Sequence, residues 1–77
     1  MLFNNNTEIT FRLEKQISGK IGIINNLGSK IKSYCFNGTE GQNSIIVNVE
    51  GIPPGIYYYT LEINNMVVDI KKMVVVR

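Results

Sequence analysis

Residues 55–76 read GIYYYTLEINNMVVDIKKMVVV, and apolar side chains recur there at every second position. The residues that share one face in the first part of this stretch are Tyr57, Tyr59, Leu61 and Ile63. A period of two is that of a β-strand. The link Asn64-Asn65 is typical of a tight antiparallel hairpin, because asparagine tolerates a positive φ. We therefore predict a hairpin whose second arm, Val67 to Val76, is one bent strand or two short ones.

The rest of the chain repeats this pattern. Alternating apolar residues occupy positions 7–13, 20–24, 30–36 and 44–49. Turn-forming residues separate these runs, and we expect Asn37-Gly38 to form a type I′ turn. Six or seven short strands at this spacing indicate an all-β fold, an Ig-like antiparallel β-sandwich formed by residues 1–77 as a single domain. The predicted core positions are Ile9, Phe11, Leu13, Ile21, Ile23, Ile31, Cys35, Ile45, Val47, Tyr57, Tyr59 and Leu61.

The composition also favours strands. The chain has twelve Ile and seven Val against four Leu and no Ala, and branching at Cβ suits a pleated surface. A net charge of +2, from scattered basic residues, gives no indication of a nucleic-acid partner. The apolar runs are too short for a membrane-spanning helix, and we see no signal peptide after Met1. Any export signal is therefore expected on a longer precursor.

Few side chains are candidates for chemistry. The chain has no histidine, and its one cysteine, Cys35, is predicted to be a buried and inert thiol. Alternation sends Tyr58 to the face opposite Tyr57 and Tyr59, so the three rings cannot form one stacking platform. The acids are predicted to be solvated surface groups; they are Glu8, Glu14, Glu40, Glu50, Glu62 and Asp69. We predict no catalytic site, no metal site and no cofactor.

Three segments together resemble a known family. Residues 3–13 resemble its opening strand, although Met1-Leu2 stands where the family has Asn-Pro. Residues 19–31 resemble its second motif through Leu27-Gly28, with Ser29 where Arg or Gln is common. Residues 53–61, beginning at Pro53-Pro54-Gly55, and residues 71–77 resemble its closing motif. The ordered set is similar to the type A C-terminal sorting domain of the type IX (Por) secretion system of Bacteroidota.

This resemblance implies that the domain is a sorting signal rather than an enzyme. Such a domain follows an N-terminal cargo that reaches the periplasm, and the outer-membrane translocon recognises it. A sortase-type peptidase then usually removes it, and the cargo is secreted or held at the cell surface. We accordingly expect residues 1–77 to be part of a larger exported protein, with the translocon and the peptidase as partners. The motif residues at turns are Leu27, Gly28, Pro54 and Gly55.

The residues expected to meet the translocon are Lys71, Lys72, Met73, Val74, Val75, Val76 and Arg77. We hypothesise that the terminal segment from Ile70 adds to the edge of an acceptor sheet. Exposed strand edges also make a homodimer an expected possibility. The alternative function is a generic Ig-like binding or spacer module, for example a carbohydrate-binding accessory domain that uses Tyr34, Phe36 or Tyr58. A small carboxylate enzyme is a third, more distant alternative.

Overall fold

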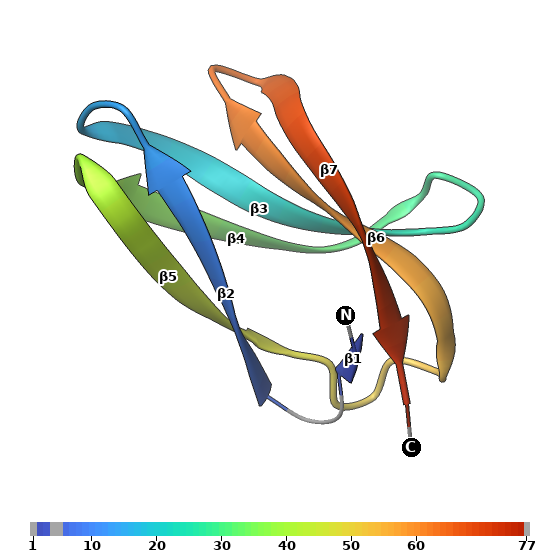
Figure 1. Cartoon of the computed structure of the whole chain (residues 1–77). Coiled ribbons are helices and arrows are strands. Elements are labelled where there is room, and N and C mark those ends of the chain that lie inside the picture. The colour runs from blue at the N-terminus through green and yellow to red at the C-terminus, as the bar shows by residue number, and fades with distance from the viewer. Residues whose placement is uncertain (1, 4–5, 77) are drawn as a thin grey trace.

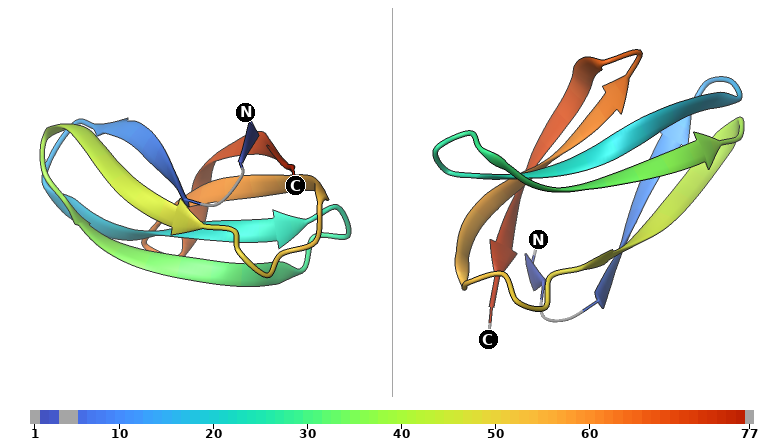
Figure 2. Two further views of the ribbon diagram at one scale, coloured as in Figure 1. Left: turned by 90° about the horizontal axis from the view of Figure 1, so that it is seen from below. Right: turned by 180° about the vertical axis from the view of Figure 1, so that it is seen from behind.

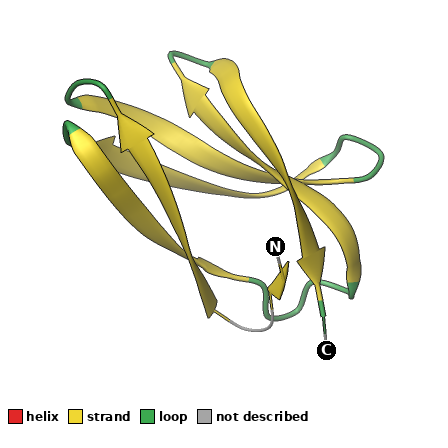
Figure 3. Ribbon diagram, in the orientation of Figure 1, coloured by secondary structure: helices red, strands yellow, loops and turns green. Residues whose placement is uncertain are grey.

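The computed structural model describes residues 2–3 and 6–76, and in this part of the chain all regular structure is β-strand (Figure 3). The first strand is two residues long, and the other six have eight to ten residues each. The strands are β1 (Leu2–Phe3), β2 (Asn6–Leu13), β3 (Ile17–Asn25), β4 (Lys30–Gly38), β5 (Gly41–Asn48), β6 (Gly55–Ile63) and β7 (Met66–Val75). Within the described residues no helix is long and apolar enough to cross a bilayer.

The strands form two sheets. One has five strands in the order β1-β7-β6-β3-β4, and the other pairs β2 with β5 (Figure 1). Strands β2 and β5 lie over β3 and β4 as a second layer, while the β6–β7 hairpin lies to their side (Figure 2). Neighbouring strands are antiparallel except β1 and β7, which run parallel. The prediction of a small all-β, Ig-like sandwich is confirmed, with one short parallel pair added.

The core lies between the two layers. Alternation in β2 buries Ile9, and alternation in β3 buries Ile21 and Ile23. The buried cluster is completed by residues from the second half of the chain: Val47, Val49, Ile52, Tyr57, Met73 and Val75. Partly buried side chains packed against it are Phe11, Tyr34, Phe36, Ile45, Tyr59 and Leu61, and Leu13 is buried at the end of β2. Both layers therefore contribute apolar side chains to one thin core, as expected for so short a chain.

Strand β4 turns the face opposite to the predicted one toward the core. Cys35 is exposed and Ile31 is 40% exposed, so their prediction as core residues is wrong. The reason is the pairing with β3, in which Ile21 is opposite Tyr34 and Lys20 is opposite Cys35. Directly opposed residues share a face of the sheet, so the buried Ile21 draws Tyr34 inward. Both faces of β4 carry apolar residues, and alternation alone could not distinguish them.

The two tight turns predicted from Asn residues have different outcomes. Asn64 and Asn65 have φ of 52° and 63°, the positive values of a type I′ turn, and the β6–β7 hairpin is confirmed. A type I′ turn at Asn37-Gly38 is wrong, because both residues belong to β4. Gly38 is buried there, and a Cβ on it would collide with the Leu13 side chain. The chain instead leaves the sheet at Thr39 and Glu40 and enters the other layer at Gly41, whose φ is 99°.

A tyrosine fixes the loop that enters β6. The Tyr57 hydroxyl donates a 2.7 Å hydrogen bond to the Pro53 carbonyl oxygen, four residues upstream. The Tyr57 ring is buried in the core, so the hydroxyl ties the surface loop to packed side chains. This bond holds the start of β6, and with it the β6–β7 hairpin, at a defined position relative to the core.

Candidate functional site: the open edge of the last strand

Strand β7 has β6 as a neighbour on one side, but on its other side a neighbouring strand covers only one end. The pairing with β6 runs from Val75 to Met66 and is interrupted at Val68, where the register shifts. On the outer side β1 reaches only Val74 and Val75. Residues 66–73 therefore form an edge with no strand beside it among the described residues, and we call them the open edge (Figure 1).

The side chains of the open edge are unusually apolar for their exposure. Met66, Val67, Val68 and Ile70 are between 53% and 67% exposed. Lys71 and Lys72 follow them, and both are exposed. A long exposed apolar edge offers unpaired backbone groups to another strand, and most proteins avoid it unless it has a use. The open edge is thus the strongest candidate for an interaction surface on this molecule.

The last residues of β7 are instead anchored in the core. Met73 is 0% exposed and Val75 is 2% exposed, and both belong to the core cluster. Val74 is partly buried and Val76 is exposed, while Arg77 lies outside the described residues. Of the seven residues predicted to meet the translocon, the structure places Lys71, Lys72 and Val76 at the surface. Met73 and Val75 hold the strand in place.

An amide at the middle of the open edge has a partner from its own strand. The Ile70 N–H donates to Asp69 Oδ1 at 2.9 Å. Ile70 is opposite Thr60 on β6, yet its amide bonds the neighbouring carboxylate. This amide therefore faces away from β6, in a pair that exchanges no ladder bonds. A β-bulge between Leu61 and Glu62 shifts the register close by, and bulges commonly alter an edge in this way.

A narrow groove runs beside the open edge, between β2 and the β6–β7 hairpin. Its apolar wall includes Phe11, Tyr59 and Leu61, and its β7 side carries Asp69 and Lys71. Burial raises the pKa of the Tyr59 hydroxyl above its usual value, and the Asp69 carboxylate raises it further. Asp69 and Lys71 carry opposite charges two positions apart, and both lie on the face of β7 that borders this groove.

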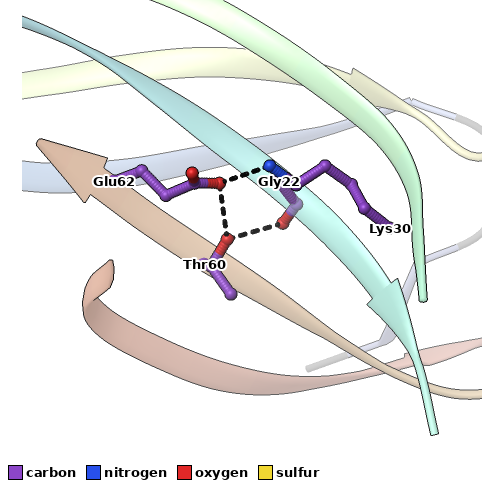
Figure 4. Close-up of polar contacts among 4 residues, drawn as sticks. All are labelled: Gly22, Lys30, Thr60 and Glu62. Atoms are coloured by element: carbon purple, nitrogen blue, oxygen red, sulfur yellow. Dashed lines mark hydrogen bonds and ion pairs between the residues drawn. The ribbon is translucent and has the colours of Figure 1, made fainter. Parts of the chain in front are cut away.

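The opposite face of the five-stranded sheet carries one polar cluster that links β6, β3 and Lys30 at the start of β4. Lys30 Nζ lies 2.8 Å from Glu62 Oε2, and the Thr60 hydroxyl lies 3.4 Å from the same oxygen (Figure 4). The Thr60 hydroxyl also donates to the Gly22 carbonyl at 3.5 Å. A Cβ on Gly22 would come within 2.9 Å of the Thr60 hydroxyl, so glycine makes room for it. The hydrogen bond from Lys30 lowers the pKa of Glu62, against the opposing effect of burial.

The exposed turn between β3 and β4 holds the Leu27-Gly28 motif. Asn25 Oδ1 accepts hydrogen bonds from the Leu27 and Ser29 amides, both at 2.9 Å, and Gly28 has a φ of 87°. Leu27 is 85% exposed at the tip of this turn. The turn conformation needs Gly28 and Asn25 but not a leucine. The sequence identified Leu27 only as part of a turn motif, whereas the structure shows that its side chain is at the surface, where a partner can contact it.

The described part of the structure forms neither the aromatic sugar-binding platform of the alternative function nor a metal site. Tyr34 and Phe36 pack against the core, and the Tyr34 hydroxyl lies 3.3 Å from both the N and the O of Asn48. Tyr58 neighbours Lys72 in the sheet and lies on the outer face, so the three rings form no common platform for a sugar. Among the described residues no group of three or more His, Cys, Asp or Glu side chains is placed to hold a metal ion.

Comparison with known families agrees with the geometry of a displayed C-terminal strand. A family model described as "secretion system C-terminal sorting domain" matches residues 3–76. The chain belongs to this family of sorting domains. The match covers strand β2, the Leu27-Gly28 turn and all of β7, so the resemblance to type IX sorting domains is confirmed. No curated protein and no solved structure is similar enough to add to this comparison.

Family membership establishes the function at a coarse level. A type IX C-terminal sorting domain is a secretion signal, and such domains mark proteins that are exported to the cell surface or secreted. A sorting signal implies a cargo on its N-terminal side and a secretion apparatus that receives it. Membership in a family of signals also indicates a non-catalytic domain.

Proposed function

We propose that this sorting domain directs its cargo from the periplasm across the outer membrane through the type IX translocon. The folded domain acts as a recognition signal, and a sortase-type peptidase then removes it from the cargo at the cell surface. The observation that carries the proposal is the combination of the family match over residues 3–76 with the open edge of β7. Residues 1–77 are then the C-terminal domain of a larger exported protein.

The recognition step that the geometry supports is strand addition. Residues 66–73 offer unpaired backbone groups, and an acceptor strand of the translocon can form main-chain hydrogen bonds with them. Exposed Lys71 and Lys72 point to opposite faces of the sheet and can select an acceptor with acidic groups. Recognition in this form requires a folded domain, because Met73 and Val75 must be buried to hold the strand in position.

The position of β1 leaves the open edge accessible. Strand β1 pairs with Val74 and Val75, at the end of the sandwich opposite the Asn64-Asn65 turn (Figure 1). Because β1 runs parallel to β7, a chain that extended β1 backwards from Leu2 would lie beside Met73 and the open edge. The proposal therefore requires the connection to the cargo to turn away from the sheet ahead of Leu2.

The test is export of a reporter that carries this domain at its C-terminus in a host with a working type IX system. Deletion of residues 71–77 is a poor variant, because it also removes the buried Met73 and Val75. Lys71→Ser with Lys72→Ser removes the exposed charges and leaves the core intact. The matched control is Arg12→Ser with Lys15→Ser, which removes two exposed charges elsewhere. Loss of export only in the Lys71/Lys72 variant supports the proposal, and normal export in that variant refutes it.

A further inference from the structure

The middle of the open edge is complementary to itself. Asp69 and Lys71 flank Ile70 on the same face of β7, and both are exposed. The Ile70 amide faces outward and donates a 2.9 Å hydrogen bond to the Asp69 carboxylate. A negative and a positive group placed symmetrically about an apolar residue will match the same three residues running in the opposite direction.

Backbone geometry restricts how two such edges can pair. In an antiparallel pair, directly opposed residues either exchange two hydrogen bonds or both turn their groups away. When the two strands are identical and related by a two-fold axis, this rule forces the axis to pass through a residue rather than between residues. The open edge therefore allows only a few registers, one for each residue on which the axis can lie.

Charge disfavours three of these registers and favours one. An axis through Asp69 opposes two carboxylates, and an axis through Lys71 or Lys72 opposes two ammonium groups, which is unfavourable directly across a ladder. An axis through Ile70 opposes two isoleucines and forms two Asp69–Lys71 pairs. This axis also lies near the middle of residues 66–73, clear of the part of β7 that β1 covers.

We propose that two copies of this domain associate through their open edges, antiparallel, with the two-fold axis at Ile70. The Ile70 amide of each copy exchanges its bond to Asp69 for a bond to the carbonyl of the other Ile70. The freed Asp69 carboxylate then faces Lys71 of the second copy. The two five-stranded sheets become one continuous sheet, and the apolar side chains of both edges meet. This inference does not depend on the proposed function, because it needs no component of the secretion apparatus.

Charge reversal tests the register. The chain is examined by sedimentation equilibrium from micromolar to millimolar concentration, as wild type, Asp69→Lys, Lys71→Asp and the double swap. Each single change opposes like charges twice, and we expect it to weaken the dimer about tenfold. The double swap restores opposite charges and should restore dimerisation. Glu8→Lys and Lys15→Glu, at exposed positions away from β7, are the matched controls and should dimerise as the wild type does.

Cross-linking gives an independent readout. In a Cys35→Ser background, Ile70→Cys places two thiols on the axis, at a Cα separation of about 5.5 Å that a disulfide can span. Met66→Cys lies at the far end of the edge and serves as its control. Oxidised glutathione should link the Ile70→Cys variant much faster. A wild type that stays monomeric at millimolar concentration, a double swap as weak as the single variants, or equal linking at both cysteines would each overturn the proposal.

Discussion

The two parts of β7 differ in what holds them. Around Met73 and Val75 the strand has β6 on one side, β1 on the other and the core beneath it. From Met66 to Lys72 it has β6 alone, and its apolar side chains are exposed. One strand thus has a part that is anchored in the core and a part that is exposed and open to a partner. The difference shows how a domain with a thin core can offer an edge for recognition without losing its fold.

The largest expected effect comes from the anchored part. Met73→Ala removes a fully buried side chain and should cost about 2–5 kcal/mol of unfolding free energy. A domain of this size has little stability to lose, so much of the variant should be unfolded at room temperature. Urea titration followed by circular dichroism measures the change, with Ile70→Ala as the matched variant in the open part. Equal losses of unfolding free energy in both variants would show that the anchored and the open parts of β7 do not differ in their contribution to stability.

The hairpin turn is expected to have the next largest effect. Asn64 and Asn65 hold positive φ, and a residue with a Cβ but no local hydrogen bonding is strained in that region. Asn65→Ala should cost about 1–2 kcal/mol, whereas Asn65→Gly should be close to neutral. Thermal unfolding of the two variants makes the comparison. If alanine is tolerated as well as glycine, the turn does not constrain the open part of β7.

The brace on the outer face gives a smaller, pH-dependent effect. Glu62 lies opposite Val67 of the open edge, and the hydrogen bond from Lys30 lowers its pKa below the ordinary value of 4.5. A depressed pKa in the folded state stabilises the fold above the unfolded pKa, and this stabilisation disappears as the pH falls through the folded value. The wild type should therefore exceed Glu62→Gln in stability near neutral pH, and the gap should close in acid. A gap that widens in acid would contradict this sign.

The smallest change in stability should come from the exposed lysines. Lys71→Ser with Lys72→Ser should alter the unfolding free energy by less than about 0.5 kcal/mol, because neither side chain is buried. The same variant should lose export of a fused reporter. Stability and export are measured on one preparation of each protein. A large loss of stability in this variant would show that the lysines act through the fold and not at its surface.

Much of this architecture follows from patterns in the sequence. The Asn64-Asn65 link between two alternating runs identifies the β6–β7 hairpin, and single-sided alternation places Ile9 and Val47 on the core face. Strand β4 has apolar residues on both faces, so only its pairing with β3 determines that Tyr34 and not Cys35 turns inward. Local propensity at Asn37-Gly38 favours a turn, but Gly38 is needed where a side chain would collide with Leu13.

The candidate site was only partly predictable for a similar reason. The family resemblance identifies residues 71–77, but pattern alone does not separate buried Met73 from exposed Lys72. That distinction depends on which face of β7 turns toward the core, and the pairing with β6 sets it by placing Met73 opposite the buried Tyr57 and Lys72 opposite Tyr58. The exposure of Leu27 likewise depends on the turn that Asn25 closes.

Amide hydrogen exchange along β7 tests most directly whether the strand is open in one part and anchored in the other. The measurement is made on the dilute chain, where association is negligible. We expect fast exchange at the Ile70 amide, which faces away from β6, and strong protection at the Lys71 and Met73 amides on the paired side. Uniform protection from Met66 to Val75 would contradict the account, because it would mean that the edge is already covered.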